Sequence, residues 1–576
     1  MSAVLTAQEP SAKYLVNLQP PLVRHFDLIA QAPGGVARLR ELILTLAVQG
    51  KLVPQDPSDE PASELLKKIR AEKDRLIAEG KIKRDKPLAE ITDEEKPFDL
   101  PTGWEWARIP EITHGLGQGE PTASFSYIDV AAIDNAKGRI ALEVQVLEAS
   151  DAPSRARKNV AQGTVIYSTV RPYLKNIAVV EYEYVPRAIA STAFAVMHPH
   201  TGVLSKYLLH YLRSEPFTEF VNSKAVGVAY PAINDANFFQ GVIALPPAAE
   251  QSRIVTRVEE LMQLCDALEA SGQLEAQQHA QLLGTLLATL TQSETPEALA
   301  DNWQRIATHF DVLLDRPEAV DALEQTILQL AVRGLLVPQD PTDEPASVLL
   351  QKIRTEKDHL IAQGKIKRDK LLPPITDEEK PFELPQGWEW AMVGHIAETN
   401  TGFAFKSSEY KSEGTLVFRV TNIRPDGSVD LSDSKFIDPI SAESTYKGFK
   451  LQAGDVLLVM VGGSLGKIGV VDEKCLPAVL NQNMWKIVIN KNVDRQFFVL
   501  CMRYINRYQL KVTSSTHGHL AQGEYLQKLV GLPPYVEQIR IVNRVNELSS
   551  LCADLRQRLA AGQAVQSHLA DALVTG

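Results

Sequence analysis

The chain lacks any long apolar run. Among its 576 residues, no stretch approaches the roughly 18 apolar residues in a row that a membrane-spanning helix needs. The first thirty residues also lack the short apolar core of a secretory signal. With 44% hydrophobic and 23% charged residues, the composition is that of a protein that folds in water. We therefore expect a cytoplasmic protein without membrane contact, with about three or four domain-sized units.

Cysteine is scarce. The four cysteines, Cys265, Cys475, Cys501 and Cys552, do not have the spacing of metal ligands, and they are too few for a disulfide framework. A reducing compartment is the simplest setting for them. The sequence also offers no recognisable set of nucleophile, base and orienting group. We expect no catalytic site, no bound metal and no cofactor held by this chain.

A phosphate-binding loop is missing, although one segment resembles it. Residues 460–470 read MVGGSLGKIGV. Three residues separate Gly462 from Gly466, whereas a phosphate loop has four. Ile468 follows Lys467, where that loop needs a Ser or Thr hydroxyl for Mg²⁺. The segment is better explained as two strands joined by a glycine-rich turn.

The most informative feature is an internal duplication. Residues 43–69, ILTLAVQGKLVPQDPSDEPASELLKKI, recur at 327–353 as ILQLAVRGLLVPQDPTDEPASVLLQKI. The match continues without a gap, at an offset of 284 residues, to LPTGWEWA (100–107) and LPQGWEWA (384–391). A second pair of matching segments follows at an offset of 287 residues. These are LPPAAEQSRIVTRVEELMQLCDAL (245–268) and LPPYVEQIRIVNRVNELSSLCADL (532–555). The period is far longer than that of a solenoid repeat.

Two unlike segments lie between the duplicated blocks, so a repeated frame carries two different inserts. We expect five parts in the chain. They are a first helical frame (1–103), a first insert (104–247), a central helix with the second copy of the frame (248–387), a second insert (388–534) and a C-terminal helix (535–576).

The duplicated blocks predict helices. Ile254, Val258, Leu261, Cys265 and Leu268 follow alternating steps of four and three, as in a coiled-coil seam, and Ile541, Val545, Leu548, Cys552 and Leu555 repeat the pattern. The two helices can pair with each other, or each can be a plain amphipathic helix on its own domain. Pro61 and Pro345 are placed as first helical residues, and Gly80 and Gly364 follow the predicted helix ends.

The inserts predict a mixture of strands and helices. AGDVLLVMVGGSLGKIGVV (453–471) has the pattern of strand, turn and strand. QGTVIYSTVRPYLKNIAVV (162–180) aligns with it when Gly163 is placed on Gly454. We expect the same hairpin in both inserts, with different side chains at its tip.

The negative charge of the chain is concentrated in the frame. The net charge is −11, which at first argues against nucleic acid. Residues 107–245 carry 12 basic and 12 acidic residues, and residues 391–531 carry 16 and 13, so the frame holds a net −14. A neutral or slightly basic insert can place its cations on one face and bind phosphates there.

Together these features resemble the specificity subunit of type I restriction–modification enzymes. The resemblance is carried by LAVQGKLVPQDPSDEPASELL, the LPTGWEW entry, RPYLKNIAVV, GGSLGKIGVV and the LPP..EQ.RIV exits, and it covers nearly the whole chain. It implies a mixed α and β fold. Two α/β target-recognition domains would be joined by long antiparallel coiled-coil helices, with approximate two-fold symmetry.

The resemblance also implies function and partners. Each target-recognition domain would read one half of a bipartite, asymmetric DNA site, and the frame would dock two modification subunits that methylate adenine with S-adenosylmethionine. A restriction subunit, where present, would use ATP and Mg²⁺ for translocation and cleavage. The chain itself would be a noncatalytic DNA-binding subunit.

Candidate DNA contacts follow from side-chain chemistry. Arg and Lys pair with guanine, and Asn or Gln pair bidentately with adenine. Ser191 and Thr192 match a step that follows this hairpin in the family. In the first insert the candidates are Arg155, Arg157, Lys158, Arg171, Lys175, Asn176, Ser191, Thr192 and Tyr230. In the second insert they are Lys406, Arg419, Asn422, Arg424, Ser464, Lys467, Asn481, Gln482, Asn483, Thr516, His517 and His519. Any of them can be a solvated surface residue, and we expect about a third to touch DNA, many at phosphates.

Two other functions fit parts of the pattern. LPPY (532–535) resembles the adenine-binding loop of N6-adenine methyltransferases, but Leu532 replaces the hydrogen-bonding Asn or Asp, and the sister copy reads LPPA. A fused or stand-alone methyltransferase would bind the cofactor in isolation. A helical scaffold that binds only protein would show no DNA sequence preference.

Overall fold

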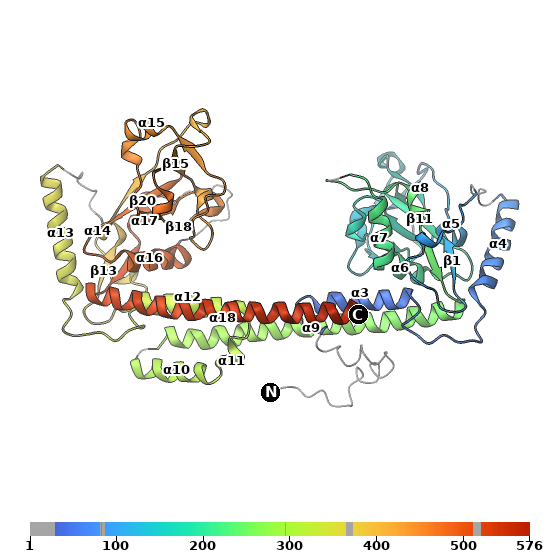
Figure 1. Ribbon diagram of the computed structural model, residues 1–576, viewed down its shortest axis with the longest axis horizontal. Coiled ribbons are helices and arrows are strands. Elements are labelled where there is room, and N and C mark those ends of the chain that lie inside the picture. The colour runs from blue at the N-terminus through green and yellow to red at the C-terminus, as the bar shows by residue number, and fades with distance from the viewer. Residues whose placement is uncertain are drawn as a thin grey trace. The chain divides into compact units, whose positions relative to one another are not determined.

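The computed structural model has a mixed α and β fold, as predicted (Figure 1). It describes residues 29–30, 32–80, 82, 87–227, 229–293, 295–364, 372–510 and 520–575. The chain divides into two compact units. Unit 1 runs to Glu275 and also includes Gly562–Gly576, and unit 2 is Ala276–Ala561. Within the described residues, no helix is both long and apolar enough to cross a membrane.

Unit 1 combines three sheets with frame helices. Its helices are α3 (Gly35–Val48), α4 (Ala62–Ala78), α5 (Ile109–Ile112), α6 (Ser205–Arg213), α7 (Glu215–Lys224), α8 (Asp235–Phe238) and the start of α9 (Ala248–Thr291). Its strands are β1 (Glu105–Arg108), β2 (Thr113–His114), β3 (Phe125–Ile128), β4 (Ile133–Asp134), β5 (Arg139–Ile140), β6 (Gln145–Leu147), β7 (Ala156–Asn159), β8 (Val165–Ser168), β9 (Ile177–Val179), β10 (Ala188–Ser191), β11 (Phe194–Pro199) and β12 (Val242–Leu245). The strand orders are β1-β12, β6-β3-β10-β7 and β2-β11-β8-β9-β5-β4.

Unit 2 repeats this organisation. Its helices are the end of α9, α10 (Pro296–Thr308), α11 (Phe310–Leu313), α12 (Pro317–Val332), α13 (Ala346–Ala362), α14 (Val393–Ile396), α15 (Pro439–Glu443), α16 (Arg495–Tyr504), α17 (Gln522–Leu526) and the start of α18 (Tyr535–Thr575). Its strands are β13 (Glu389–Met392), β14 (Ala397–Thr401), β15 (Thr415–Phe418), β16 (Lys435–Ile437), β17 (Val456–Val459), β18 (Ile468–Val470), β19 (Ala478–Leu480), β20 (Met484–Ile489) and β21 (Leu529–Leu532). The strand orders are β13-β21, β14-β20-β17-β18 and β16-β15-β19.

The two inserts share one fold although their sequences differ. The hairpin β8–β9 in the first insert corresponds to β17–β18 in the second, and both pairs are antiparallel. Likewise, β3 pairs with β10 in parallel, as β15 pairs with β19. The central strands of these pairs are buried at every position. Apolar residues there are enough to form the sheet, so the side chains on the loops are free to differ. The predicted hairpin in both inserts is confirmed.

Each insert is closed at its base by the duplicated motifs. β1 pairs with β12 and β13 with β21, which brings the WEW and LPP…EQ motifs together. The indole Nε1 of Trp104 donates to Glu250 at 3.0 Å, and that of Trp388 donates to Glu537 at 3.1 Å. Both carboxylates are buried, so each indole N–H has the partner that a buried donor requires.

The frame helices lie close to their predicted bounds. Pro61 and Pro345, predicted as first helical residues, are the N-cap residues of α4 and α13, which begin one position later at Ala62 and Ala346. Gly80 and Gly364 follow the helix ends with φ of 70° and 67°, a left-handed conformation that glycine adopts without strain.

The seam residues are buried, or partly buried at Leu268, Leu548 and Leu555, but within their own units. The seam of α9 lies in the core of unit 1 beside α3, and the seam of α18 lies in the core of unit 2 beside α12. Arg40 of α3 pairs with Asp266 and Glu269 of α9. This placement matches the alternative in which each helix packs on its own domain.

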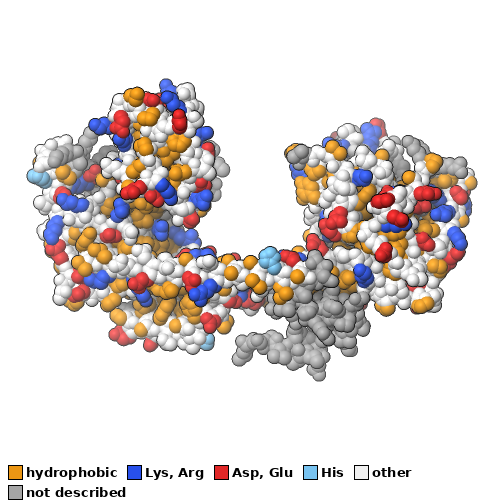
Figure 2. All heavy atoms as spheres, in the orientation of Figure 1, with side chains coloured by type: hydrophobic (Ala, Val, Ile, Leu, Met, Phe, Trp, Pro, Cys, Tyr) orange, Lys and Arg blue, Asp and Glu red, His pale blue; other side chains and the backbone are white. Residues whose placement is uncertain are grey.

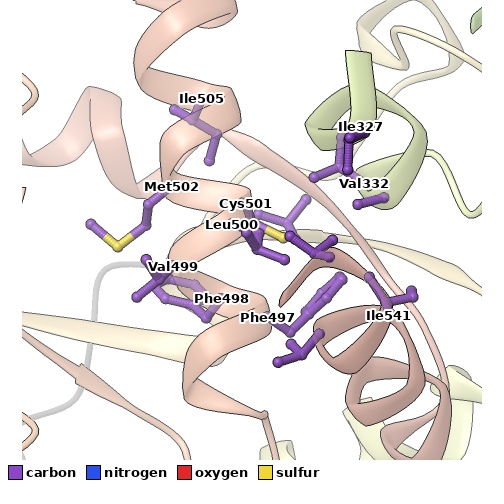
Figure 3. Close-up of a cluster of buried hydrophobic side chains, with 14 of the residues drawn as sticks. Ile327, Val332, Phe497, Phe498, Val499, Leu500, Cys501, Met502, Ile505 and Ile541 are labelled. Atoms are coloured by element: carbon purple, nitrogen blue, oxygen red, sulfur yellow. The ribbon is translucent and has the colours of Figure 1, made fainter. Parts of the chain in front are cut away.

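The far end of each long helix reaches the other unit's core. In unit 2, the α9 residues Leu283, Leu287 and Leu290 share a core with α12 and α18. In unit 1, Ala570 of α18 is buried, and Asp571 pairs with Arg38 of α3 at 2.7 Å. Figure 3 shows part of the unit 2 core, where the α16 side chains pack between Ile327 of α12 and Ile541 of α18.

Candidate nucleic-acid interface

The β8–β9 hairpin ends in a tight turn, here called the first tip (residues 171–175). A single 3₁₀ turn, Pro172–Leu174, is flanked by Arg171 and Lys175, and both flanking residues have positive φ, 49° and 50°. The backbone N of Leu174 donates to the Arg171 carbonyl at 3.0 Å. The backbone N of Arg171 donates to the carbonyl of Pro231 at 2.8 Å, so a second loop holds the tip in place.

Two contacts orient the cations of the first tip. The guanidinium carbon of Arg171 lies 4.3 Å from the ring centroid of Tyr230. The ring of Tyr230 is 67% exposed, so the pair lies at the surface. The ammonium of Lys175 is 3.7 Å from a carboxylate oxygen of Glu215.

Other candidates of the first insert adjoin this tip. The backbone of Thr169 donates to Ala193, which places the turn containing Thr192 beside the start of the tip. Thr192 in turn donates to the carbonyl of Arg155 at 2.8 Å. Lys158 also lies here, because it pairs with Asp235, two residues after Ile233, which donates to Thr169. Arg157, its neighbour in the same strand, points to the other face of the sheet and pairs with Glu120. The structure therefore brings most first-insert candidates into one region.

The second insert presents the equivalent turn, here called the second tip (residues 462–466). Gly462 and Gly466 have φ of 67° and 83°. The backbone of Met460 donates to the carbonyl of Asn483 at 3.2 Å, which places the Asn481–Asn483 turn beside the tip and so near Ser464 and Lys467. The side chain of Asn506 donates to the carbonyl of Gly466 at 2.7 Å and fixes the base of the turn.

The remaining second-insert candidates follow the ends of neighbouring strands. The backbone of Asn481 donates to Phe418, so Arg419 begins its loop next to the Asn481–Asn483 turn. A hydrogen bond from Phe403 to Leu480 brings the loop of Lys406 to the same edge, and Gln482 is exposed there.

The two arginines of this edge are paired with carboxylates. Arg419 pairs with Asp433 and Arg424 with Asp430, each at 3.0 Å. Hydrogen bonds from Ser432, and then from Arg424, lower the pKa of Asp430 to about 2. The carboxylate therefore stays ionised at neutral pH and competes with phosphate for Arg424.

Three candidates are too buried to fit the predicted contacts. Asn422 is 1% exposed, and its amide bonds the Arg419 backbone N and the Asp430 carbonyl. Ser191 is 3% exposed and accepts from Ala193. Asn176 is 9% exposed at the base of the first tip. The side chains of Asn422 and Ser191 hydrogen-bond the local backbone, and Asn176 is buried, so we remove the three from the candidate set. Thr516, His517 and His519 lie outside the described residues.

The surface around the candidates carries both signs of charge. Figure 2 shows basic and acidic side chains interspersed over the visible face of both inserts. A hollow of about 850 Å³ borders Lys158, but its cations, Arg108 and Lys158, are already paired with carboxylates. Burial, with smaller effects from His200 and His198, lowers the pKa of His114 in its wall to about 4, so His114 is neutral at pH 7. The tips are better placed than this hollow for an anionic polymer.

The chemistry available at the tips is recognition. The first tip offers a stacked guanidinium, a ring and an ammonium, and the second offers exposed backbone, a hydroxyl and an ammonium. Among the described residues, no group of three or more His, Cys, Asp or Glu side chains is placed to hold a metal ion. Sequence reasoning left Tyr173 out of the candidate set, although it is 50% exposed at the first tip. Its position within the aligned hairpin turn was the available signal.

Comparison with known proteins identifies the family. Residues 385–561 match the model described as the type I restriction modification DNA specificity domain. The chain is 40% identical over 553 residues to the type I restriction enzyme EcoAI specificity subunit of Escherichia coli, covering 94% of this chain and 93% of that protein. It is 35% identical to the EcoEI specificity subunit of the same species, with the same coverage.

Solved structures add a likeness in fold. A chain from a study of complex assembly and conformational transition of the type I R-M system superposes with a TM-score of 0.51 at 23% identity, covering 83% of this chain and 98% of that one. The long match to curated relatives and the duplicated frame agree, and this chain belongs to the family of type I restriction enzyme specificity subunits.

Proposed function

We propose that this chain reads a bipartite, asymmetric DNA site, with the first insert reading one half and the second insert the other. The observation that carries the proposal is the shared fold of two inserts whose tips have different side chains. Different donors select different bases, so the two half-sites would differ. We expect the exposed candidate residues of the two tip regions to contact DNA, many of them at phosphates.

The frame would position the partners. Although the seams pack within their own units, we propose that α9 and α18 pair elsewhere along their length as an antiparallel coiled coil with approximate two-fold symmetry, because each helix begins in one unit and ends in the other. The length of these helices would then set the number of base pairs between the half-sites. A helix rises about 1.5 Å per residue, and DNA rises about 3.4 Å per base pair. Two modification subunits would dock on this frame, with restriction subunits where the system has them.

The chain would act in the cytoplasm as a noncatalytic subunit. S-adenosylmethionine would belong to the modification subunits, and ATP and Mg²⁺ to a restriction subunit. Two observations support this assignment: the relatives are specificity subunits, and Leu532, in the loop that resembles an adenine-binding motif, is buried in strand β21. A protein-only scaffold has less support, because the two inserts vary at exposed tips on a common fold.

The test is methylation mapping of the reconstituted complex. Modification subunits with this chain should methylate adenines at one split, asymmetric site, and modification subunits alone should not select it. The isolated chain, incubated with tritiated S-adenosylmethionine and DNA, should transfer no label. Label transfer by the isolated chain would favour the fused methyltransferase, and a complex without any sequence preference would exclude the proposed role.

A further inference from the structure

The two tips have left-handed backbone at the same two positions but not the same residues, and the 3₁₀ turn begins one residue earlier in the second tip. Arg171 and Lys175 occupy the places of Gly462 and Gly466 when the hairpins are aligned, and all four residues have positive φ. Several hydrogen bonds also correspond, although Lys175 donates to Pro172 whereas Gly466 donates to Val459. Leu174 donates to Arg171 as Leu465 donates to Gly462, and Ser168 donates to Asn176 as Val459 donates to Lys467.

The surroundings of the two tips correspond as well. Thr169 donates to Ala193 as Met460 donates to Asn483. Ile233 donates to Thr169 as Leu520 donates to Met460. The fold therefore requires left-handed backbone at both ends of each tip, whatever residue is present.

The first tip places side chains where glycine would be unstrained. In the left-handed region the Cβ of an L-residue crowds the following carbonyl, whereas glycine adopts this conformation freely. The second tip shows that the turn forms with glycine at both positions. Arginine and lysine at these positions in the first tip make that turn less stable. Strain of this kind persists where the side chain serves a function.

The strained arginine is also held from outside the tip. Its backbone N donates to Pro231, and its guanidinium lies over Tyr230, one residue earlier in the same loop. Reciprocal backbone hydrogen bonds between Val226 and Ala232 close that loop, and Val170 bridges to Ala232. A guanidinium stacked by its face keeps its edge available for two parallel hydrogen bonds.

We propose that Arg171 is the base-reading residue of the first insert, that it reads a guanine in the first half-site, and that Tyr230 is its positioning residue. This rests on the proposed function. The guanidinium carbon of Arg171 lies over the Tyr230 ring, which fixes the plane of the guanidinium. The Arg171 Nε is buried, so the two Nη atoms form the edge offered to DNA. Arginine in such a plane matches the O6 and N7 acceptors of guanine in the major groove. Lys175, at the other left-handed position, contacts a phosphate, since its ammonium is a point charge.

Paired substitutions separate strain from recognition. Arg171→Gly and Arg171→Ala both remove the guanidinium, but only glycine relieves the backbone strain. In the reconstituted complex, both should lose discrimination at one guanine of the first half-site by roughly 5- to 150-fold. Arg171→Gly should unfold a few degrees above Arg171→Ala. Equal melting temperatures for the two variants would show that the backbone at Arg171 is not strained, and would contradict this part of the inference.

The positioning role has its own readout. Tyr230→Ala should weaken discrimination at the same guanine and leave the second half-site unchanged, and Tyr230→Phe, which keeps the ring, should retain most of the preference. Replacing that guanine by 7-deazaguanine should weaken the wild-type complex and have no effect on Arg171→Gly. Lys175→Gly should weaken binding to all sequences alike and reduce its salt dependence.

The outcomes separate this inference from the proposed function. If the wild-type complex selects a split site and Arg171→Gly selects the same bases equally well, the inference is wrong and the proposed function stands. If the wild-type complex selects no site at all, the proposed function fails first.

Discussion

At the scale of single residues, a buried carboxylate anchors each insert to its frame. Glu250 accepts from Trp104 and from Gln55, and Glu537 accepts from Trp388 and Gln339. Burial raises the pKa of both carboxyls, while these hydrogen bonds act in the opposite direction. The same hydrogen bonds in both units explain why the WEW and EQ motifs occur in both copies of the frame.

Removing one anchor should destabilise one unit. Glu250→Ala leaves the Trp104 N–H buried without a partner, which costs about 1–3 kcal/mol. Differential unfolding in denaturant should show the unit 1 transition shifted and the unit 2 transition unchanged. Glu537→Ala is the matched control and should shift only the other transition. An unchanged transition in both variants would show that the anchors do not hold the inserts.

The candidate site was only partly predictable from single residues. Residue type indicated Arg171, Lys175 and Tyr230 as candidate DNA contacts, and the fold brings these three residues together at the first tip. The same reasoning selected Asn176 and Asn422, which are buried. Residue type alone does not tell which face of a short strand or turn is inside, because that depends on packing partners far away in the sequence. The positive φ of Arg171 also had no sequence signal except the glycine aligned with it.

At the scale of elements, the two copies of the frame differ in one cluster of ion pairs. The arginine lies on the frame helix in unit 1 but on the long helix in unit 2. In unit 1, Arg40 of α3 pairs with Asp266 and Glu269 of α9 at 2.6 and 2.8 Å. In unit 2, Arg556 of α18 pairs with Asp321 and Glu324 of α12 at 2.6 and 2.9 Å. Glu324 occupies the duplicated position of Arg40, and Arg556 that of Glu269.

Because the charges are reversed between the two units, α3 is complementary to α9 and α12 is complementary to α18. Exchanging α3 and α12 would place like charges opposite each other, which is unfavourable between adjacent helices. The duplicated chain thereby distinguishes its two halves with few substitutions.

Charge-swap variants test this matching. Arg40→Glu should lower the stability of unit 1 by about 1 kcal/mol at low salt, because it places a third carboxylate beside Asp266 and Glu269 on exposed helix faces. Adding Glu269→Arg restores an opposite-charge pair with the polarity of unit 2 and should recover most of the loss. High salt should reduce the difference. Denaturant unfolding at two salt concentrations is the measurement, and a double variant less stable than the single one would contradict the matching.

Elements were predicted better than their partners. Proline and glycine bounded α4 and α13 to within a residue or two, since both residues restrict the backbone locally. The seam spacing identified buried positions in α9 and α18 correctly. It did not identify what buries them, because a period of 3.5 residues defines a face and not its partner.

At the scale of the whole molecule, the duplication supplies two readers on one covalent frame. The repeat, visible in the sequence, implied two inserts, and the structure shows that they share a fold despite their divergence. The extent of that likeness could not be predicted from the sequence, because strands buried on both faces need apolar residues but not particular ones.

The measurement that tests the two-reader account most directly is a methylation map of a complex whose chain carries the first insert twice. Residues 388–534 would be replaced by a second copy of residues 104–247, with the frame unchanged. The account predicts that the methylated site becomes an inverted repeat of the first half-site, with the same unread gap between the halves. Retention of the original asymmetric site, or a site that lacks the first half-site, would contradict it.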